Sequence, residues 1–154
     1  MDLAGVRVEL PTNQPIVLLK EKDGERYLPI WIGAAEAAAI ALSLQGVVTP
    51  RPMTHDLLKN ILDDLGVTVH RIVVTELREG TFYAQLDMRR NGTSYEVSSR
   101  PSDAIALAVR MSVPIFANEE VLAEASILIP GDEDEEVEKF REFLENVTPE
   151  DFES

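Results

Sequence analysis

Residues 67–99 read VTVHRIVVTELREGTFYAQLDMRRNGTSYEVSS, and this stretch decides the fold. Apolar and polar side chains alternate along much of it, which is typical of half-buried strands. Gly80 marks one turn, and Asn91-Gly92 is the strongest short hairpin signal in the chain. The stretch therefore predicts a three-stranded antiparallel meander.

Further strands are expected ahead of the meander. Residues 6–10 alternate between apolar and charged side chains, and residues 16–19 and 27–32 flank a turn around Gly24. The last two runs predict a hairpin. Pro29 has no N–H to donate, so its strand is expected to lie at a sheet edge or to bulge there.

Three main helices are expected around these strands, over residues 34–44, 53–65 and 101–111. A short strand over 114–117 and a short helix over 118–123 should follow the third. This order of elements predicts a single compact α+β domain. Its sheet would be mixed or antiparallel, built from the hairpin and the meander.

The composition, with 45% hydrophobic residues among 154, is that of a soluble globular protein. There is no cysteine, no signal-peptide layout and no apolar run long enough to span a bilayer, so a cytoplasmic location is expected. Of the net charge of −14, residues 131–154 carry −9. We therefore expect a domain over residues 1–130, followed by an acidic linker and a C-terminal amphipathic helix. The charge disfavours tight non-specific binding of nucleic acid.

Two short blocks have a similar order of residue types: residues 51–56, RPMTHD, and residues 100–103, RPSD. Each places an Arg-Pro pair just ahead of a hydroxyl residue and a carboxylate, and each opens an apolar run with helical spacing. Glu36 lies in a third helix start. Helix starts have unpaired N–H groups and favour anions, so these positions are the natural candidates for a functional site.

If the three helix starts converge on one cleft, they supply two sets of functional residues. The candidate catalytic residues, which would also bind Mg²⁺ or Mn²⁺, are Glu36, His55, Asp56 and Asp103. The candidate substrate-binding residues are Arg51, Arg100, Ser102 and Thr54. Thr54 and Ser102 are most simply explained as N-caps. No organic cofactor is expected, because no dinucleotide or phosphate-loop motif is present.

A plainer interpretation stays open. Each carboxylate can simply interact with a helix dipole, which stabilises by roughly 0.3–1 kcal/mol. The two blocks can also be architectural, with Arg51 paired to Asp103 and Arg100 paired to Asp56. An open pocket lined by these residues would count against that interpretation.

Three blocks carry a resemblance to a known family: residues 28–37, LPIWIGAAEA; residues 51–58, RPMTHDLL; and residues 100–108, RPSDAIALA. They resemble the bifunctional nuclease domain family, and the likeness extends over residues 3–130. The acidic ending, including residues 137–144, resembles that of actinobacterial members.

The resemblance implies a compact α+β domain that forms homo-oligomers, most simply dimers. It also implies a nuclease, with activity on DNA and RNA attributed to plant members. The expected function is thus metal-dependent hydrolysis of phosphodiester bonds in nucleic acid, with no membrane partner. The alternative is a non-catalytic module that binds an anion or a protein, which the acidic charge favours.

Overall fold

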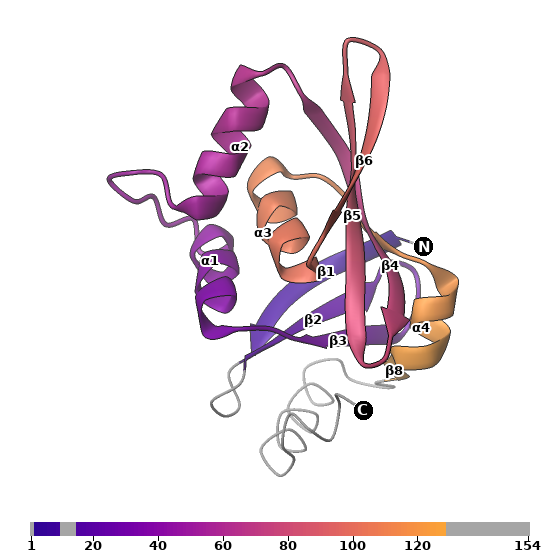
Figure 1. Ribbon diagram of the computed structural model, residues 1–154. Helices are drawn as coiled ribbons and strands as arrows, with labels where there is room; N and C mark the ends of the chain where they lie inside the picture. The colour runs from indigo at the N-terminus through magenta and orange to yellow at the C-terminus, as the bar shows by residue number, and fades with distance from the viewer. Residues whose placement is uncertain (1, 10–14, 129–154) are drawn as a thin grey trace.

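The computed structural model describes residues 2–9 and 15–128 (Figure 1). Its strands are β1 (Asp2–Glu9), β2 (Ile16–Glu21), β3 (Arg26–Trp31), β4 (Thr68–Arg78), β5 (Thr81–Arg90), β6 (Thr93–Ser99), β7 (Ile115–Ala117) and β8 (Ile127–Leu128). Its helices are α1 (Ala34–Leu44), α2 (Thr54–Asp64), α3 (Pro101–Met111) and α4 (Glu119–Ala125). The predicted α+β class is confirmed.

The strands form a mixed sheet in the order β6-β5-β4-β7-β1-β2-β3-β8. Only β4 and β7 run parallel among these neighbours. The predicted meander is β4-β5-β6, and its hairpin turn has positive φ at both Asn91 and Gly92, as a two-residue turn of this kind requires. The short strand β7 joins the meander to the hairpin half of the sheet.

The hairpin β2-β3 is also confirmed, and it explains how the sheet accommodates Pro29. Strand β8 pairs only with Arg26 and Tyr27, so within the described part of the chain no strand pairs with β3 on that side at Pro29. The missing N–H of Pro29 therefore costs no ladder hydrogen bond. Strand β8 itself was not predicted, because two residues are too few for a periodic signal.

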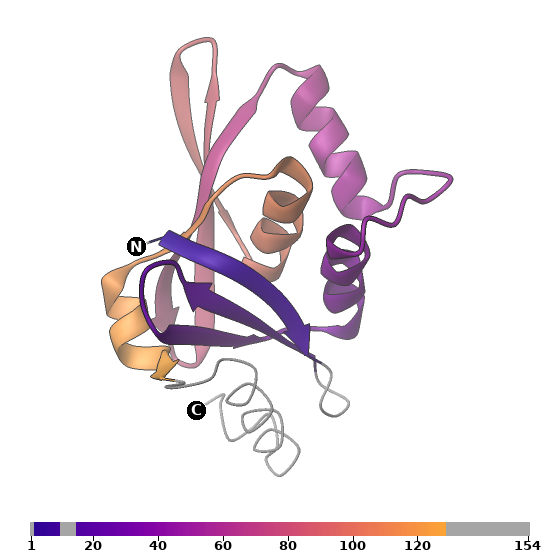
Figure 2. The same cartoon turned by 180° about the vertical axis from the view of Figure 1, so that it is seen from behind.

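Helix α3 is the centre of the helical layer. It packs against α1 and α2 on one side and against β4 and β5 on the other. Figures 1 and 2 show α1, α2 and α3 grouped together, with α4 at the far end of the molecule. The run from Ala104 to Ala108 is almost fully buried. Its three alanines allow neighbouring elements to approach closely, so the start of α3 is held firmly.

The helix starts differ from the prediction in one respect. The N-cap positions of α2 and α3 are Met53 and Arg100, so Thr54 and Ser102 lie inside the first turns. The interpretation of Thr54 and Ser102 as N-caps is therefore wrong. An apolar and a basic residue occupy the cap positions because carboxylates and tertiary contacts stabilise these helix starts instead.

Residues 131–154, where an acidic helix is predicted, lie outside the described residues, so the division at residue 130 stays a prediction. Among the helices of the described part, none has the length and apolar character needed to cross a bilayer.

Candidate active site

The starts of three helices meet beside one pocket of about 300 Å³. Glu36 comes from the first turn of α1, His55 from the first turn of α2, and Asp103 from the first turn of α3. Arg100, at the N-cap of α3, links them. All four side chains line the pocket. We call this group the Arg100 cluster.

Arg100 binds two carboxylates from different helices. Its Nε and Nη2 donate to the two oxygens of Asp103, at 2.9 and 3.0 Å, and its Nη1 donates to Glu36 Oε1 at 3.0 Å. A guanidinium carries five N–H donors, so two remain for another partner. The side chain is 63% exposed, so these donors are accessible from outside. The hydrogen bonds to Asp103 and then to Glu36 raise the pKa of Arg100.

His55 and Asp103 form a partly buried pair behind Arg100. His55 Nε2 lies 3.0 Å from Asp103 Oδ1, and His55 is only 9% exposed. Burial raises the pKa of Asp103, but hydrogen bonds from Arg100 and His55 outweigh it, so the pKa of Asp103 is lowered overall. An ionised aspartate fixes the orientation of the imidazole and stabilises its protonated form. A histidine held in this way is equipped for proton transfer.

Asp56 does not join the Arg100 cluster. Its Oδ2 accepts a hydrogen bond from the Met53 N–H at 3.0 Å, and its Oδ1 accepts one from Arg110 Nε at 2.7 Å. Arg110 also donates to the carbonyl oxygens of Ala39 and Ala106, both at 2.9 Å. Its side chain is only 7% exposed. Arg110 thus ties α1, α2 and α3 together just below the cluster.

Sequence reasoning missed Arg110. A signal was present: residues 101–111 are otherwise mostly apolar, and a lone arginine near the end of such a helix must find partners if the helix is buried. The proposed architectural pairs, Arg51 with Asp103 and Arg100 with Asp56, are wrong. The observed partner of Asp56 is Arg110.

The remaining predicted substrate-binding residues are placed differently from one another. Arg51 is exposed in the loop between α1 and α2, and its side chain makes no hydrogen bond or ion pair with the described part of the chain. Thr54 lines the same pocket as the Arg100 cluster. Ser102 lines a neighbouring pocket that Arg100 also borders. The structure thus brings Thr54, Ser102 and Arg100 together and leaves Arg51 apart.

The four predicted metal ligands do not gather into one ligand set. Within residues 2–9 and 15–128, no three His, Asp or Glu side chains are arranged to hold a metal ion. Glu36 and Asp103 bind Arg100, and Asp56 binds Arg110. A cation between Glu36 and Asp103 would have to replace Arg100, so in this arrangement the residues do not fit a metal.

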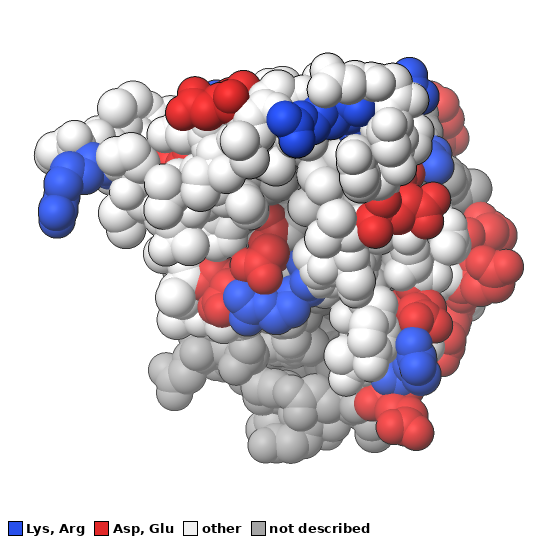
Figure 3. Space-filling view, turned by 45° about the horizontal axis from the view of Figure 1, so that its top comes forward, with Lys and Arg blue, Asp and Glu red and all other residues white. Residues whose placement is uncertain are grey.

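Basic side chains do not form a broad patch on the face of the molecule drawn in Figure 3. The described Lys and Arg side chains of that face are scattered, and several lie directly beside Asp or Glu. Affinity for a polyanion through many phosphate contacts is therefore not built into this face. Any anion would be bound locally, at a residue such as Arg100.

Acid should weaken the contact between Asp56 and Arg110. The hydrogen bond from Arg110 and that from the Met53 N–H lower the pKa of Asp56 below its ordinary value of 3.8. A lowered folded-state pKa stabilises the protein above pH 3.8, and this stabilisation is lost as the pH falls through the folded-state value. We expect the free energy of unfolding to decline from about pH 5 downward, and the decline to be shallower in Asp56→Asn. Urea unfolding of both proteins between pH 3 and pH 6 measures this. If the free energies of unfolding of both proteins declined equally with falling pH, the decline would not come from Asp56.

The fold and the Arg100 cluster define a class: an α+β domain that holds a histidine–aspartate pair and an accessible arginine at converging helix starts. The sequence model of the family described as the bifunctional nuclease domain matches residues 17–130. The chain belongs to this family, and several plant relatives carry the name bifunctional nuclease.

Individual relatives fall into two groups. An uncharacterized protein of Mycobacterium tuberculosis (strain H37Rv) is 52% identical over 97% of this chain and 95% of its own length. Bifunctional nuclease 1 of Arabidopsis thaliana is 32% identical over 68% of this chain and 33% of its own length. Bifunctional nuclease 2 of the same plant is 31% identical over 71% of this chain and 35% of its own length. The chain thus spans about a third of the plant proteins.

Proposed function

We propose that this protein hydrolyses phosphodiester bonds in nucleic acid and that the Arg100 cluster is its reaction centre. The family supports the class of reaction. The observation that supports the location is the accessible guanidinium of Arg100, with two unused donors, held next to the His55–Asp103 pair in an open pocket. An arginine side chain can bind a phosphate group through two parallel hydrogen bonds. Hydrolysis of a phosphodiester bond is helped by a side chain that accepts and donates protons.

The charges of the cluster set a condition on phosphate binding. One arginine faces two carboxylates, so the cluster is net negative while His55 is neutral. A phosphate therefore has to be bound through the two free N–H donors of Arg100, without help from a general excess of positive charge.

In the proposed reaction, water attacks phosphorus and the bond from phosphorus to the leaving oxygen breaks. His55 takes a proton from the water at the ring nitrogen that does not face Asp103, and it passes the proton to the leaving oxygen. Asp103 stabilises the protonated ring between these steps. Arg100 donates hydrogen bonds to the phosphate oxygens, where negative charge develops.

The requirement for Mg²⁺ or Mn²⁺ stays a prediction. The described residues offer no ready ligand set, so no step above passes through a metal. Assays with added Mg²⁺, with added Mn²⁺ and with EDTA decide the requirement. They do so independently of the roles of His55 and Arg100.

Replacing His55 tests the proposal directly. We expect His55→Asn to slow cleavage of end-labelled single-stranded DNA and RNA by at least about 100-fold, because the proton carrier is lost. The matched control is His70→Asn, since His70 is the other histidine and is exposed on β4. Gel analysis of the products under each metal condition measures the rates. Equal trace activity in the wild type and in both variants would point to a contaminating nuclease and would refute the proposal.

One observation favours the alternative, a module that binds an anion without turnover. Arg100 is already paired with two carboxylates, an arrangement that is stable without a substrate. A ligand that binds only the folded state raises its unfolding temperature. A rise with phosphate or nucleotides, together with no cleavage under any metal condition, would establish the alternative.

The predicted homo-oligomer and the cytoplasmic location stay predictions. Helix α2 presents exposed apolar side chains that a second copy of the chain could cover: Leu57, Ile61 and Leu65. They lie beside the two leucines, Leu58 and Leu62, that pack against the core. This wide apolar face is compatible with the dimer that the resemblance implies.

A further inference from the structure

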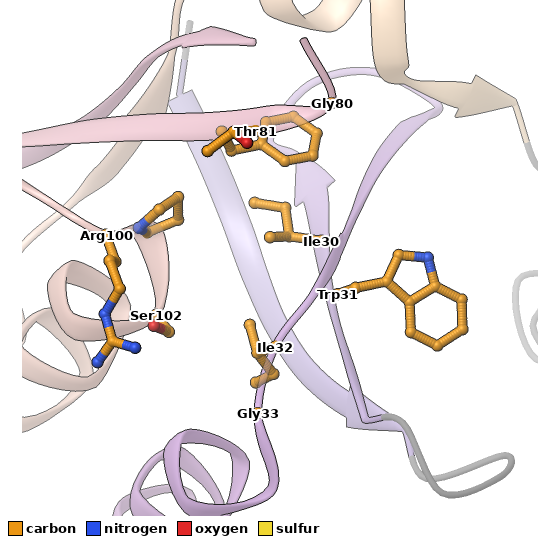
Figure 4. A pocket seen from close by; sticks show the side chains of 10 residues that line it. Ile30, Trp31, Ile32, Gly33, Gly80, Thr81, Arg100 and Ser102 are labelled. Carbon is orange, nitrogen blue, oxygen red and sulfur yellow. The ribbon is translucent and has the colours of Figure 1, made fainter. Parts of the chain in front are cut away.

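A second pocket also borders Arg100 and is distinct from the pocket of the Arg100 cluster. It has a volume of about 330 Å³ and is bounded by the end of β3, the turn between β4 and β5, and the start of α3. Figure 4 shows Ile30, Ile32, Thr81 and Ser102 around this space, with Arg100 at its border. Arg100 lines both pockets, so a ligand bound by its guanidinium can extend into either one.

The walls of this second pocket are mainly apolar. Ile30 and Ile32 come from the end of β3, Phe82 from the start of β5, and Pro101 from the start of α3. Phe82 is partly buried and packs against the hydrophobic core. An aromatic ring and a proline ring on different elements suit a flat, apolar group.

One polar group inside this pocket has no partner. Ser102 is only 6% exposed, and its side chain makes no hydrogen bond with the described residues. It lines the pocket next to Arg100 (Figure 4). The hydroxyl oxygen is not enclosed by protein atoms, so it can exchange a hydrogen bond with a ligand in the pocket.

We propose that this pocket is a nucleobase slot, which holds one unstacked base of a single-stranded substrate whose phosphate binds Arg100. The inference rests on the proposed function, because it takes Arg100 as the phosphate-binding residue. A base has flat apolar faces for Phe82 and the isoleucines, and polar edges for Ser102. A simple anion would gain nothing from contact with the apolar walls. A purely apolar group would make no hydrogen bond with the Ser102 hydroxyl.

The charge of the protein supports the same conclusion. A net charge of −14 disfavours affinity that comes from many phosphate contacts. A nuclease of this kind needs contacts with the bases themselves. A base can enter a slot only when it is out of a duplex stack, which is least costly in a single strand. The slot therefore predicts a preference for single-stranded over double-stranded substrates.

Binding of mononucleotides to the intact protein tests the slot. Isothermal titration calorimetry measures the affinities. Trp31 borders the slot, but its indole points away from Ser102 and Arg100 (Figure 4), so its fluorescence is not a suitable readout. Adenosine and uridine 5′-monophosphates should bind saturably, and ribose 5-phosphate should bind at least about fivefold more weakly, because it lacks a base to stack. Equal affinity for nucleotides and ribose 5-phosphate would overturn the proposal.

Variants separate the slot from the phosphate site. Phe82→Leu keeps an apolar side chain but removes the flat ring, and should weaken nucleotide binding at least about fivefold without changing the affinity for inorganic phosphate. The matched control is Phe116→Leu, on β7, where the ring contacts Arg71 instead. Ser102→Ala should also weaken nucleotide binding, and it checks the result if Phe82→Leu lowers stability. Unchanged nucleotide affinity in both slot variants would refute the slot.

Failure of the slot and failure of the proposed function give different results. An oligonucleotide that lacks the base next to one phosphate should be cut more slowly at that phosphate. If cleavage there is unaffected, the slot is wrong and the nuclease proposal stands. If nucleotides bind as expected but nothing is cleaved under any metal condition, the nuclease proposal is wrong and the slot remains as a nucleotide-binding site.

Discussion

Replacing Arg100 with glutamine is expected to reduce cleavage of single-stranded nucleic acid by at least about 100-fold, the usual cost of losing a preorganised donor to the transition state. The expected effect on stability is small. Arg100 is 63% exposed, and ion pairs at such positions contribute about 1 kcal/mol or less. Initial rates on a labelled oligonucleotide and thermal unfolding of the same preparations measure both effects.

Two further variants sharpen this test. Arg100→Lys keeps the charge but loses the planar fork, so it should recover only part of the activity. Arg71→Gln is the matched control, because Arg71 is also about half exposed and is also paired with a carboxylate, Asp87, at 2.6 Å. Arg71→Gln should cleave like the wild type. Full activity in Arg100→Gln would show that the Arg100 cluster is not the reaction centre.

The fold could be predicted from the sequence because its elements carry local signals. The Asn91-Gly92 turn, the alternation over residues 67–99 and the Ala-rich run over residues 34–44 each depend on neighbours in the chain. Strand β8 was not predictable, because its two residues take extended form only by pairing with β3. The parallel pairing of β7 with β4 likewise depends on tertiary packing, because α3, which precedes β7 in the chain, crosses the sheet against β4 and β5.

The site was predictable in part. Proline and carboxylate positions locate helix starts, and Glu36, His55 and Asp103 indeed come from three starts that meet. Asp56 was predicted to share a ligand set with His55, but its two carboxylate oxygens accept hydrogen bonds from Arg110 and from the Met53 N–H. Adjacent residues on an α-helix point about 100° apart, so the two side chains leave α2 in different directions. Asp56 turns toward Arg110 instead.

The pairing of charges needed the structure. Arg51 and Arg100 stand in matching sequence contexts, yet only Arg100 reaches carboxylates of other elements. The difference lies in what precedes each block. Arg100 follows β6 directly, whereas Arg51 ends an exposed loop after α1. The repeated Arg-Pro motif therefore predicts a helix start in both places. The position of each motif in the fold determines whether its arginine lies in the site.

The largest expected effect on stability is that of replacing Arg110 with methionine. Arg110 is 7% exposed and donates three hydrogen bonds that join three helices. Removing it leaves one Asp56 oxygen without its partner, and the Ala39 and Ala106 carbonyls lose a second hydrogen bond while keeping their helical ones. Breaking a fully buried ion pair costs about 3–5 kcal/mol, but Asp56 is 36% exposed and can be hydrated, so we expect about 2–3 kcal/mol. For a chain of this size the unfolding temperature falls by about 4–12 °C.

A double-mutant cycle decides whether this cost comes from the pair with Asp56. In the Asp56→Asn background, Arg110→Met should cost less, because no carboxylate is left without its cation. Arg78→Met is the control, since Arg78 is exposed and its one carboxylate partner among the described residues is Glu76, so its replacement should change stability very little. Urea unfolding gives all four free energies. An equal cost in both backgrounds would show that Arg110 acts through the backbone carbonyls alone, and that the Asp56 carboxylate does not help to hold α2, and with it His55, in place.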